Sequence, residues 1–171
     1  MATDLGSGVG MAAVDTPLGT LTVFTTGEGV VATSFDSDPG SLAEMAGLLG
    51  SEPRWSIGYS GEAAQEVDAY FRGGLEKFLT PIDLRLVPAG FQRRVLQVTS
   101  QISFGELWTY GDVAESAGSP RGGRAAGNAL NRCPMELFVP CHRVVHVGGT
   151  LGGYGAHEER KRWLLSHEGH F

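Results

Sequence analysis

The periodicity of the hydrophobic residues changes part-way along the chain, and this change constrains the fold more than any other feature. Residues 12–35 are rich in β-branched and aromatic side chains, and Gly27 and Gly29 interrupt them. This composition favours strands joined by a hairpin. Residues 62–71 instead space their apolar side chains as a helix does. Residues 11–80 therefore predict a small sheet with a helix packed on it, without a cluster of catalytic groups.

The second half of the chain has a helical pattern. After a strand or connector at residues 81–90, apolar side chains recur every three or four residues and predict a buried helix stripe: Phe91, Val95, Val98 and Ile102. Phe104 and Gly105 are expected to end this helix. A last helix is predicted at residues 158–167.

Two further helices are predicted between these elements. Thr109 can cap a helix at residues 110–117, and the Gly118-Ser119-Pro120 break precedes another helix at residues 121–131. A helix, a glycine-containing turn and a second helix form the outline of a helix-turn-helix unit. The fold class is therefore α/β (α+β), with a mainly helical second part.

Three segments follow from these patterns. Residues 1–10 are expected to be a flexible tail, residues 11–80 a structural α/β domain, and residues 81–171 a functional domain. Hydrophobic content of 42% and charged content of 19% are typical of folded proteins. No apolar run reaches the roughly 18 residues that a membrane span needs, and the N-terminus lacks the basic start of a signal peptide. We therefore expect a cytoplasmic protein without membrane attachment.

The charges are unevenly distributed. The net charge of −6 alone disfavours nucleic-acid binding. Residues 119–144, however, carry one acid, Glu136, against several basic side chains: Arg121, Arg124, Arg132 and Arg143. A nucleic-acid contact would therefore be small and confined to this segment.

The helix predicted at residues 121–131 has unusually small side chains around Arg124. They are Gly122, Gly123, Ala125, Ala126 and Gly127. Each glycine costs a helix about 1 kcal/mol relative to alanine, so the close approach of another surface must compensate. That surface is either a neighbouring helix or a nucleic-acid groove probed by Arg124.

The segment Pro140-Cys141-His142-Arg143-Val144 carries the chemistry. A cysteine is a nucleophile as its thiolate, and nearby His or Arg side chains lower its pKa from about 8.5. His142 and Arg143 follow Cys141 directly, but neighbours on a strand point to opposite faces. Taken alone, the segment is compatible with a structural or a catalytic role. Because Cys133 is the one other cysteine, a disulfide scaffold of a secreted protein is excluded.

This segment resembles the active-site signature of the O6-alkylguanine-DNA alkyltransferase family. Other blocks resemble the family in the same order and at fitting spacing: Phe91–Val95, Phe104–Gly111, Arg124–Gly127, Gly152–Gly155 and Trp163–Gly169. The resemblance is good over residues 81–169. It is weaker over residues 15–85, where Asp15–Gly19 resembles the family's first strand turn.

The resemblance implies DNA repair by direct reversal of damage. Cys141 would accept the alkyl group of O6-alkylguanine, and also of O4-alkylthymine, in a single irreversible turnover. His142 would take the thiol proton through a water molecule, and Glu168 would orient His142. No cofactor is implied, and the partner would be double-stranded DNA bound by a monomer.

The resemblance also implies how the base is bound. Tyr110 would hydrogen-bond the guanine, the Gly155 amide would contact O6, and the carbonyls of Cys141 and Val144 would accept the exocyclic amine. Tyr154 would line the pocket.

The target nucleotide would be flipped out of the duplex and Arg124 would take its place in the stack. The recognition helix would enter the minor groove through its small residues, which are Gly122, Gly123, Ala125, Ala126 and Gly127. Arg121 and Arg132 would meet phosphates.

Some positions depart from the family pattern. Cys133 stands where an asparagine fixes the turn before the active-site strand. Either Asn131 or backbone groups substitute for it, or the turn is looser and the reaction slower. Gly155 replaces a common serine but keeps the backbone amide. Because the N-terminal half has no cysteine and no histidine cluster, no metal is expected.

Three other readings compete with alkyl transfer. The first is a protein that recognises alkylated bases with impaired transfer, if Cys133 misplaces Cys141. The second is a cysteine hydrolase using Cys141 and His142. The third is a zinc site built from Cys133, Cys141, His142 and His146, although their spacing is not typical of structural zinc sites.

Overall fold

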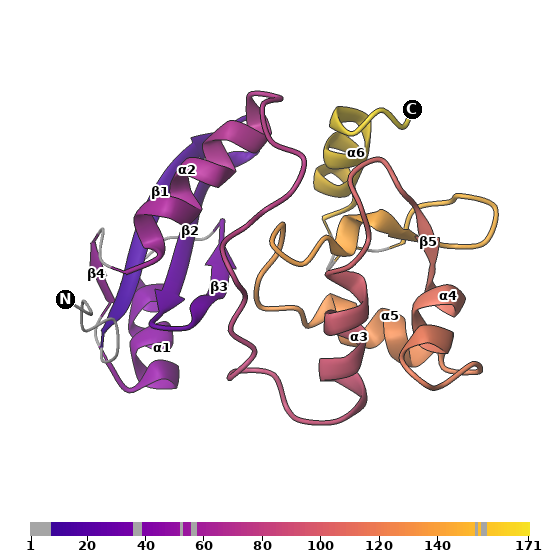
Figure 1. Cartoon of the computed structure of the whole chain (residues 1–171), viewed down its shortest axis with the longest axis horizontal. Helices are drawn as coiled ribbons and strands as arrows, with labels where there is room; N and C mark the ends of the chain where they lie inside the picture. The colour runs from indigo at the N-terminus through magenta and orange to yellow at the C-terminus, as the bar shows by residue number, and fades with distance from the viewer. Residues whose placement is uncertain (1–7, 36–38, 52, 56–57, 153, 155–156) are drawn as a thin grey trace. The chain divides into compact units, whose positions relative to one another are not determined.

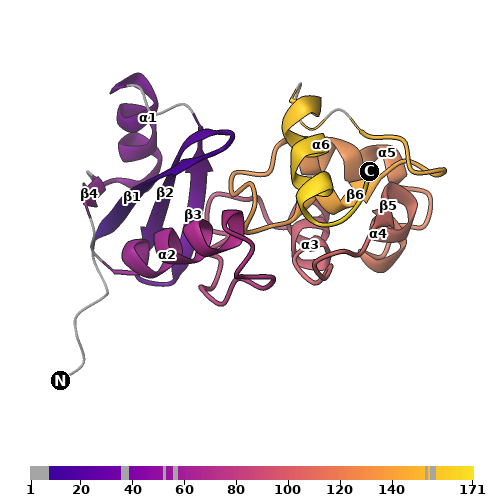
Figure 2. The same ribbon diagram turned by 90° about the horizontal axis from the view of Figure 1, so that it is seen from above.

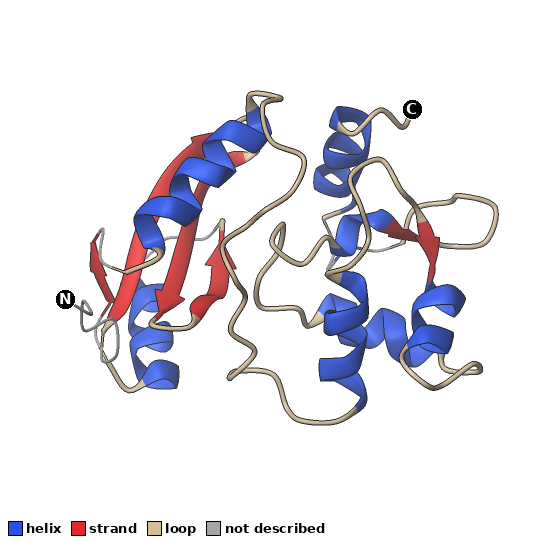
Figure 3. Ribbon diagram, in the orientation of Figure 1, coloured by secondary structure: helices blue, strands red, loops and turns tan. Residues whose placement is uncertain are grey.

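The computed structural model describes residues 8–35, 39–51, 53–55, 58–152, 154 and 157–171 (Figure 1). The chain forms two compact units, Met1–Leu86 and Val87–Phe171. The first unit combines strands and helices, whereas helices dominate the second (Figure 3). This arrangement confirms the predicted fold class.

The N-terminal unit contains a four-stranded sheet in the order β3-β2-β1-β4. Its strands are β1 (Val9–Thr16), β2 (Gly19–Thr26), β3 (Gly29–Ser34) and β4 (Pro53–Trp55). The first three strands are antiparallel neighbours, and β4 pairs in parallel with β1. The predicted hairpin is confirmed, since Thr26 pairs with Gly29. Gly29 is required there, because its φ is 145° and a Cβ would lie 2.2 Å from the carbonyl oxygen of Pro81.

Two helices cover opposite faces of this sheet (Figure 2). The predicted helix is α2 (Ser60–Phe71), which buries Ala63, Val67 and Tyr70. The second helix, α1 (Pro39–Leu49), was missed by the sequence analysis. Its apolar side chains Leu42, Met45 and Leu49 pack against a buried cluster of the sheet: Met11, Phe24, Val31 and Ala32. Helices on both faces explain why every residue from Leu21 to Thr26 is buried.

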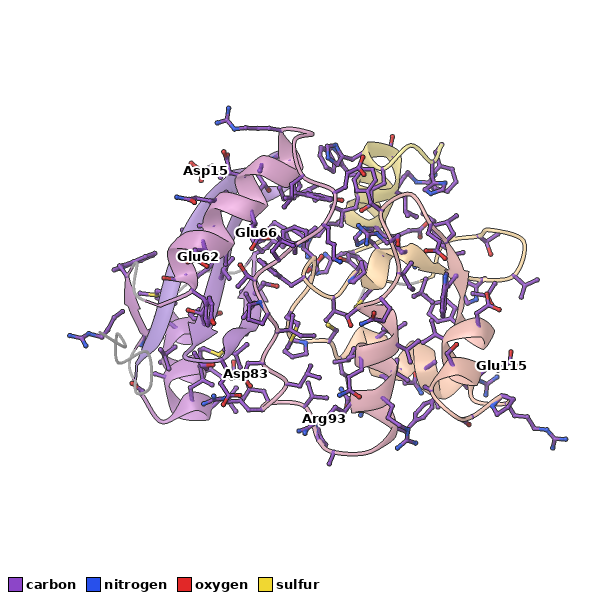
Figure 4. All side chains as sticks on the ribbon, in the orientation of Figure 1. Asp15, Glu62, Glu66, Asp83, Arg93 and Glu115 are labelled. Carbon is purple, nitrogen blue, oxygen red and sulfur yellow. The ribbon has the colours of Figure 1, made fainter. Side chains whose placement is uncertain are left out.

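The segment after α2 belongs to the first unit. Glu66 on α2 accepts a hydrogen bond from the backbone N–H of Thr80 (2.8 Å). The backbone N–H of Asp83 donates to Val30 O (2.7 Å), and the buried Asp83 carboxylate pairs with Arg85 (2.6 Å). Glu66 and Asp83 are labelled in Figure 4. These contacts attach residues 80–85 to the sheet.

The tail predicted at residues 1–10 ends earlier than expected. β1 begins at Val9, and Gly10 pairs with Thr25. The last two residues of the expected tail therefore belong to the sheet, and residues 1–7 lie outside the described part of the chain. Within that described part, no helix is long and apolar enough to cross a membrane.

The first helix of the C-terminal unit, α3 (Phe91–Thr99), is shorter than predicted. Its backbone turns after Thr99, where the N–H groups of Gln101 and Ile102 donate to carbonyls only three residues back. Ile102 is buried but lies outside the helix, and Phe104 and Gly105 do not end it. The buried face consists of Val95, Leu96 and Thr99, while Phe91 and Val98 are only partly buried.

The predicted helix-turn-helix is confirmed. Helix α4 (Tyr110–Ser116) begins with a capping box in which Thr109 and Asp112 exchange hydrogen bonds (2.8 and 3.1 Å). Gly118, with a φ of 91°, turns the chain towards α5 (Gly123–Asn131). Both helices contact α3 and each other.

Some of the small residues of α5 pack inside the unit, and others are exposed to solvent. Ala126 is fully buried, so the expectation that it belongs to the groove-facing surface is wrong. An added Cβ on Gly127 would lie 3.6 Å from the Tyr110 ring, and one on Gly123 would lie 3.8–3.9 Å from the backbone of Tyr110 and Gly111. Arg124 and Ala125 are exposed. Close helix packing therefore accounts for part of the small-residue pattern. The exposed residues Arg124 and Ala125 are able to contact a ligand.

The remaining elements of the unit contain the Pro140–Val144 segment or contact it. They are β5 (Trp108–Thr109), the short 3-10 helix η1 (Cys141–Arg143), β6 (Val144–Val145) and α6 (Glu158–His167). β5 and β6 pair in parallel. The prediction of α6 is confirmed at both ends, although Trp163 is only partly buried.

Candidate active site

The sequence predicted that Cys141 lies on a strand. This prediction is wrong, because Cys141 is the first residue of the 3-10 helix η1. The backbone N–H of Cys141 donates to Val139 O (2.8 Å), and that of Arg143 donates to Pro140 O (3.0 Å). A 3-10 helix turns by about 120° per residue, so neighbouring side chains do not alternate between faces. The strand begins only at Val144. Cys141, His142 and Arg143 are all buried by this turn.

Glu168 connects the two residues that follow Cys141. Its Oε1 lies 2.8 Å from His142 Nε2 and accepts from Arg143 Nη2 (2.8 Å), and its Oε2 accepts from Arg143 Nε (2.9 Å). Arg143 also donates to Ile102 O (2.6 Å) and lies over the Phe104 ring. The His142–Glu168 contact was predicted from the sequence, whereas the pairing of Arg143 with Glu168 was not.

The electrostatics of this group define the protonation of His142. Burial raises the pKa of Glu168, but hydrogen bonds from His142 and Arg143 outweigh burial and hold the pKa well below its usual value. Burial lowers the pKa of His142, and Glu168 only partly opposes this effect. His142 is therefore neutral at neutral pH. Because a carboxylate only accepts hydrogen bonds, the proton of the neutral ring is on Nε2 and Nδ1 is free to accept.

His142 Nδ1 is buried and has no hydrogen-bond partner among the described residues. A base atom without a protein partner is able to receive a proton from a thiol through a bridging molecule. The geometry therefore provides an acceptor (Nδ1), a ring held in one tautomer and a carboxylate that stabilises the protonated ring.

The Cys141 thiol is held in its protonated form. A hydrogen bond with the Cys133 thiol and burial raise the pKa of Cys141 well above its usual value, and the nearby Lys161 opposes them. From their position next to Cys141, His142 and Arg143 were expected to lower this pKa. Both side chains turn towards Glu168 instead. A base is therefore required before Cys141 can act as a nucleophile.

Lys161 is a residue of this site that the sequence analysis missed. Its side chain is buried on α6, and Nζ donates to Val144 O (2.5 Å) and to the Tyr110 hydroxyl (3.3 Å). Burial lowers the pKa of Lys161 to about 8, although Cys141 opposes this shift. The available signal was its spacing, since Lys161 shares the buried helix face with Leu164 and Leu165.

An open cavity of about 460 Å³ lies beside Tyr110. Its lining comes from α4, α5 and the chain after β6: Thr109, Tyr110, Gly111, Gly123, Arg124, Gly127, Asn128, Asn131, His146 and Val147. The Tyr110 and His146 rings are in contact, with centroids 4.9 Å apart. Burial raises the pKa of Tyr110, so its hydroxyl stays protonated.

Gly152 makes room for Tyr110 beside this cavity. A Cβ on Gly152 would lie 1.8 Å from the Tyr110 hydroxyl oxygen, and one on Gly127 would lie 3.6 Å from the ring. The close approach explains the glycines at positions 152 and 127. Gly155 itself lies outside the described residues.

The other predicted site residues occupy two places. Arg124 and Asn131 line the cavity, and Arg121 and Arg132 are exposed near the ends of α5. Gly122 is the residue that precedes α5.

Tyr154 is the predicted site residue whose charge interactions involve Cys141, and its backbone is left-handed (φ 42°). Burial and the nearby Glu136 raise its pKa well above the usual value. The Val144 carbonyl, predicted to bind the base, accepts from Lys161. No group of three or more metal-ligating side chains occurs among the described residues.

Family models match almost the whole chain. Residues 11–84 match the ribonuclease-like domain of 6-O-methylguanine DNA methyltransferase, and residues 90–170 match its DNA-binding domain. The chain belongs to the 6-O-methylguanine DNA methyltransferase family. The resemblance seen in the sequence motifs is thereby confirmed.

Relatives in this methyltransferase family carry the name methylated-DNA–protein-cysteine methyltransferase. One from Methanosarcina acetivorans is 42% identical over 110 residues, which are 63% of this chain and 68% of the relative. Another from Mycolicibacterium paratuberculosis is 37% identical over 155 residues, which are 91% of this chain and 89% of the relative.

Solved structures of the family have the same fold. The Mycobacterium tuberculosis O6-methylguanine methyltransferase matches with a TM-score of 0.77 and 32% identity, over 94% of this chain and 92% of that one. The crystal structure of Mycobacterium tuberculosis OGT in complex with DNA also matches with a TM-score of 0.77, at 33% identity over 95% and 92% of the chains.

Proposed function

We propose that this chain repairs DNA by moving the alkyl group of O6-alkylguanine, and also of O4-alkylthymine, irreversibly onto Cys141 Sγ. One observation carries the proposal. In a chain of this family, a buried cysteine directly precedes a neutral histidine that Glu168 holds at 2.8 Å. A nucleophile, a base and an orienting carboxylate are the parts that thiol activation needs.

The transfer forms one S–C bond and breaks one C–O bond. The Cys141 proton passes through water to His142 Nδ1, and the Glu168 carboxylate stabilises the resulting imidazolium. The thiolate then attacks the alkyl carbon while the C–O6 bond breaks and the repaired guanine leaves. Because the Cys141 pKa is raised in the free protein, the thiol stays unreactive until a substrate is positioned.

Tyr110 and Lys161 act on the leaving base. The Tyr110 hydroxyl is within hydrogen-bonding distance of the buried Lys161 ammonium (3.3 Å) and lies beside the cavity. A cation next to a hydroxyl makes that hydroxyl a better donor, which favours the departure of a base that gains negative charge. The Gly155 amide and the Cys141 and Val144 carbonyls would read the edge of the base, with Tyr154 lining the pocket.

The exposed side of α5 binds the duplex. Arg124 extends from a surface of small residues at the mouth of the cavity, which suits insertion into the stack when the nucleotide is flipped out. Gly122 and Ala125 permit close approach, while Arg121 and Arg132 contact phosphates. Since these contacts displace counterions, binding should weaken with salt.

The roles of the parts of the chain follow from this scheme. Within the predicted functional segment 81–171, residues 87–171 would bind DNA and carry out the transfer, whereas residues 81–86 belong with residues 11–80 to the structural N-terminal unit. We also infer that the protein is a monomer in the cytoplasm. Size-exclusion chromatography and cell fractionation test these two inferences.

Mass spectrometry after mixing the protein with a duplex that contains one O6-methylguanine tests the proposal. The expected result is a gain of one CH₂ on the peptide that holds Cys141, saturating at one per protein. An undamaged duplex and a Cys141→Ser variant are the controls. Tight, damage-specific binding without a mass change would contradict transfer and support recognition of alkylated bases alone.

A further inference from the structure

The chain contains two asparagines, Asn128 and Asn131, and both lie on α5 and line the cavity beside Tyr110. Both residues are exposed. Asparagine is a poorer helix former than alanine, because its side chain competes for backbone hydrogen bonds. Helix formation therefore does not explain why both asparagines of the chain occur in this nine-residue helix.

Arg124 and the two asparagines share one face of α5. Each residue of a helix is rotated by about 100° from the previous one, so positions 124, 128 and 131 lie within about 60° of one another. The opposite side of α5 is buried in the unit: Ala126, Ala129 and Leu130. The face that carries the arginine proposed to enter the DNA stack therefore also presents two amides.

The charges around this face suit a polyanion. The lining of the cavity includes the basic side chains Arg124 and His146 and no carboxylate. The single acid of residues 119–144, Glu136, lies outside the lining and pairs with Arg160 (3.0 Å). A phosphate backbone therefore meets attraction and no repulsion from the side chains that line the cavity.

We propose that Asn128 and Asn131 bind base edges in the minor groove next to the lesion, so that the protein favours damaged sites flanked by G·C pairs. The inference rests on the proposed function, in which α5 enters that groove. There an A·T pair displays only acceptors, whereas a G·C pair adds the guanine N2 amino group as a donor. An asparagine amide donates to guanine N3 and accepts from this amino group, but at an A·T pair its oxygen finds no donor.

Helix geometry sets which base pairs the amides reach. At a rise of about 1.5 Å per residue, Asn128 and Asn131 lie about 6 and 10 Å from Arg124 along the helix axis. Base pairs stack about 3.4 Å apart. Because Arg124 takes the place of the flipped nucleotide in the proposed complex, the amides should reach pairs within about three positions of the lesion.

Fluorescence anisotropy with the full chain carrying Cys141→Ser tests the inference, because this variant lacks the proposed alkyl acceptor. Each duplex contains one O6-methylguanine, and the three pairs on either side are G·C, inosine·C, A·T or 2,6-diaminopurine·T. Inosine lacks the N2 amino group, and 2,6-diaminopurine adds it to the A·T pattern. Duplexes that carry the amino group should bind about fivefold more tightly or better, as expected for one bidentate contact.

The strength of base pairing predicts the reverse order. Inosine·C pairs are held by fewer hydrogen bonds than G·C pairs, and 2,6-diaminopurine·T pairs by more than A·T pairs. Flipping a nucleotide costs less in a weakly paired duplex, so easier flipping would favour the duplexes without the amino group. Tighter binding of the duplexes with the amino group therefore reports on contacts in the minor groove.

Substitutions of the two asparagines isolate their amides. Asn128→Ala, Asn131→Ala and the protein with both changes replace a poor helix former with a good one, and circular dichroism checks their fold. The protein with both changes should bind G·C and inosine·C duplexes equally. Gln65→Ala is the matched control, because it removes an exposed amide from α2 in the N-terminal unit, and it should keep the full preference.

Equal affinities for G·C and inosine·C flanks would overturn the inference, and so would a preference that survives both asparagine substitutions. Neither result affects the proposed function, which methyl transfer by the wild-type protein tests separately. A preference that depends on the asparagines, in a protein that never accepts a methyl group, would support the inference and contradict alkyl transfer alone.

Discussion

Replacing Glu168 with glutamine changes a carboxylate that binds two buried side chains. Glu168 is 5% exposed, and Arg143 is 6% exposed. The two Glu168 oxygens bind His142 (2.8 Å) and Arg143 (2.8 and 2.9 Å). Glutamine keeps the shape but turns one acceptor into a donor that faces the Arg143 guanidinium. Breaking a buried pair in this way leaves a charge uncompensated and costs about 3–5 kcal/mol.

The cost should depend on pH in one direction. Since interactions in the fold leave the Glu168 pKa below its value in the unfolded chain, the carboxylate stabilises the fold above about pH 4.3. This contribution is lost as the pH falls from there towards the lowered pKa. The variant has no such group, so its stability deficit should be full at pH 7 and shrink in strong acid.

Urea unfolding at pH 7, followed by circular dichroism, measures the deficit. Glu158→Gln is the matched control, because Glu158 lies exposed at the start of α6, the helix that Glu168 directly follows, and pairs loosely with Arg162 (3.6 Å). The control should change the free energy of unfolding by less than about 0.5 kcal/mol. A Glu168→Gln deficit no larger than that of the control would refute the assignment of Glu168 as the counter-charge of Arg143.

Single-turnover methyl transfer separates the structural role from the chemical one. At a temperature at which both proteins are folded, Glu168→Gln should slow transfer by orders of magnitude, about 10²–10⁴-fold, because the His142 ring loses the acceptor that fixes its tautomer. Normal transfer in a destabilised variant would mean that Glu168 only supports the fold.

Other substitutions probe the cavity and the buried lysine. Arg124→Ala should weaken binding to damaged duplex by about 1–3 kcal/mol, measured by fluorescence anisotropy, and unchanged affinity would remove Arg124 from the interface. Gly152→Ala should displace Tyr110 and destabilise the chain by about 1–3 kcal/mol in thermal melts. In contrast, Gly47→Ala in α1 meets nothing within 4 Å and should stabilise it by up to about 1 kcal/mol. Lys161→Met should slow transfer yet leave the free energy of unfolding within about 1–2 kcal/mol, since relief of a buried charge offsets lost hydrogen bonds. Wild-type transfer by this variant in rapid-quench measurements would exclude a role for the lysine.

Several elements could be predicted from the sequence because they depend on neighbours in the chain. The hairpin at Gly29 follows from turn chemistry, and α4 follows from the reciprocal caps of Thr109 and Asp112. Helix α6 follows from its apolar spacing. The family signature around Cys141 likewise needs no tertiary information. In contrast, α1 was missed, because its few apolar residues become a recognisable face only when the sheet lies beneath them.

The sequence by itself therefore determined the two-part fold, the helix-turn-helix, the family and the proposal of Cys141 as nucleophile, all of which depend on local patterns. Only the tertiary structure decided how the site is charged. Burial keeps His142 neutral, the contact with Cys133 keeps Cys141 protonated, and Lys161 lies next to Tyr110 although 51 positions separate them. Desolvation and contacts between distant residues govern protonation, and neither is encoded in the spacing of neighbouring side chains.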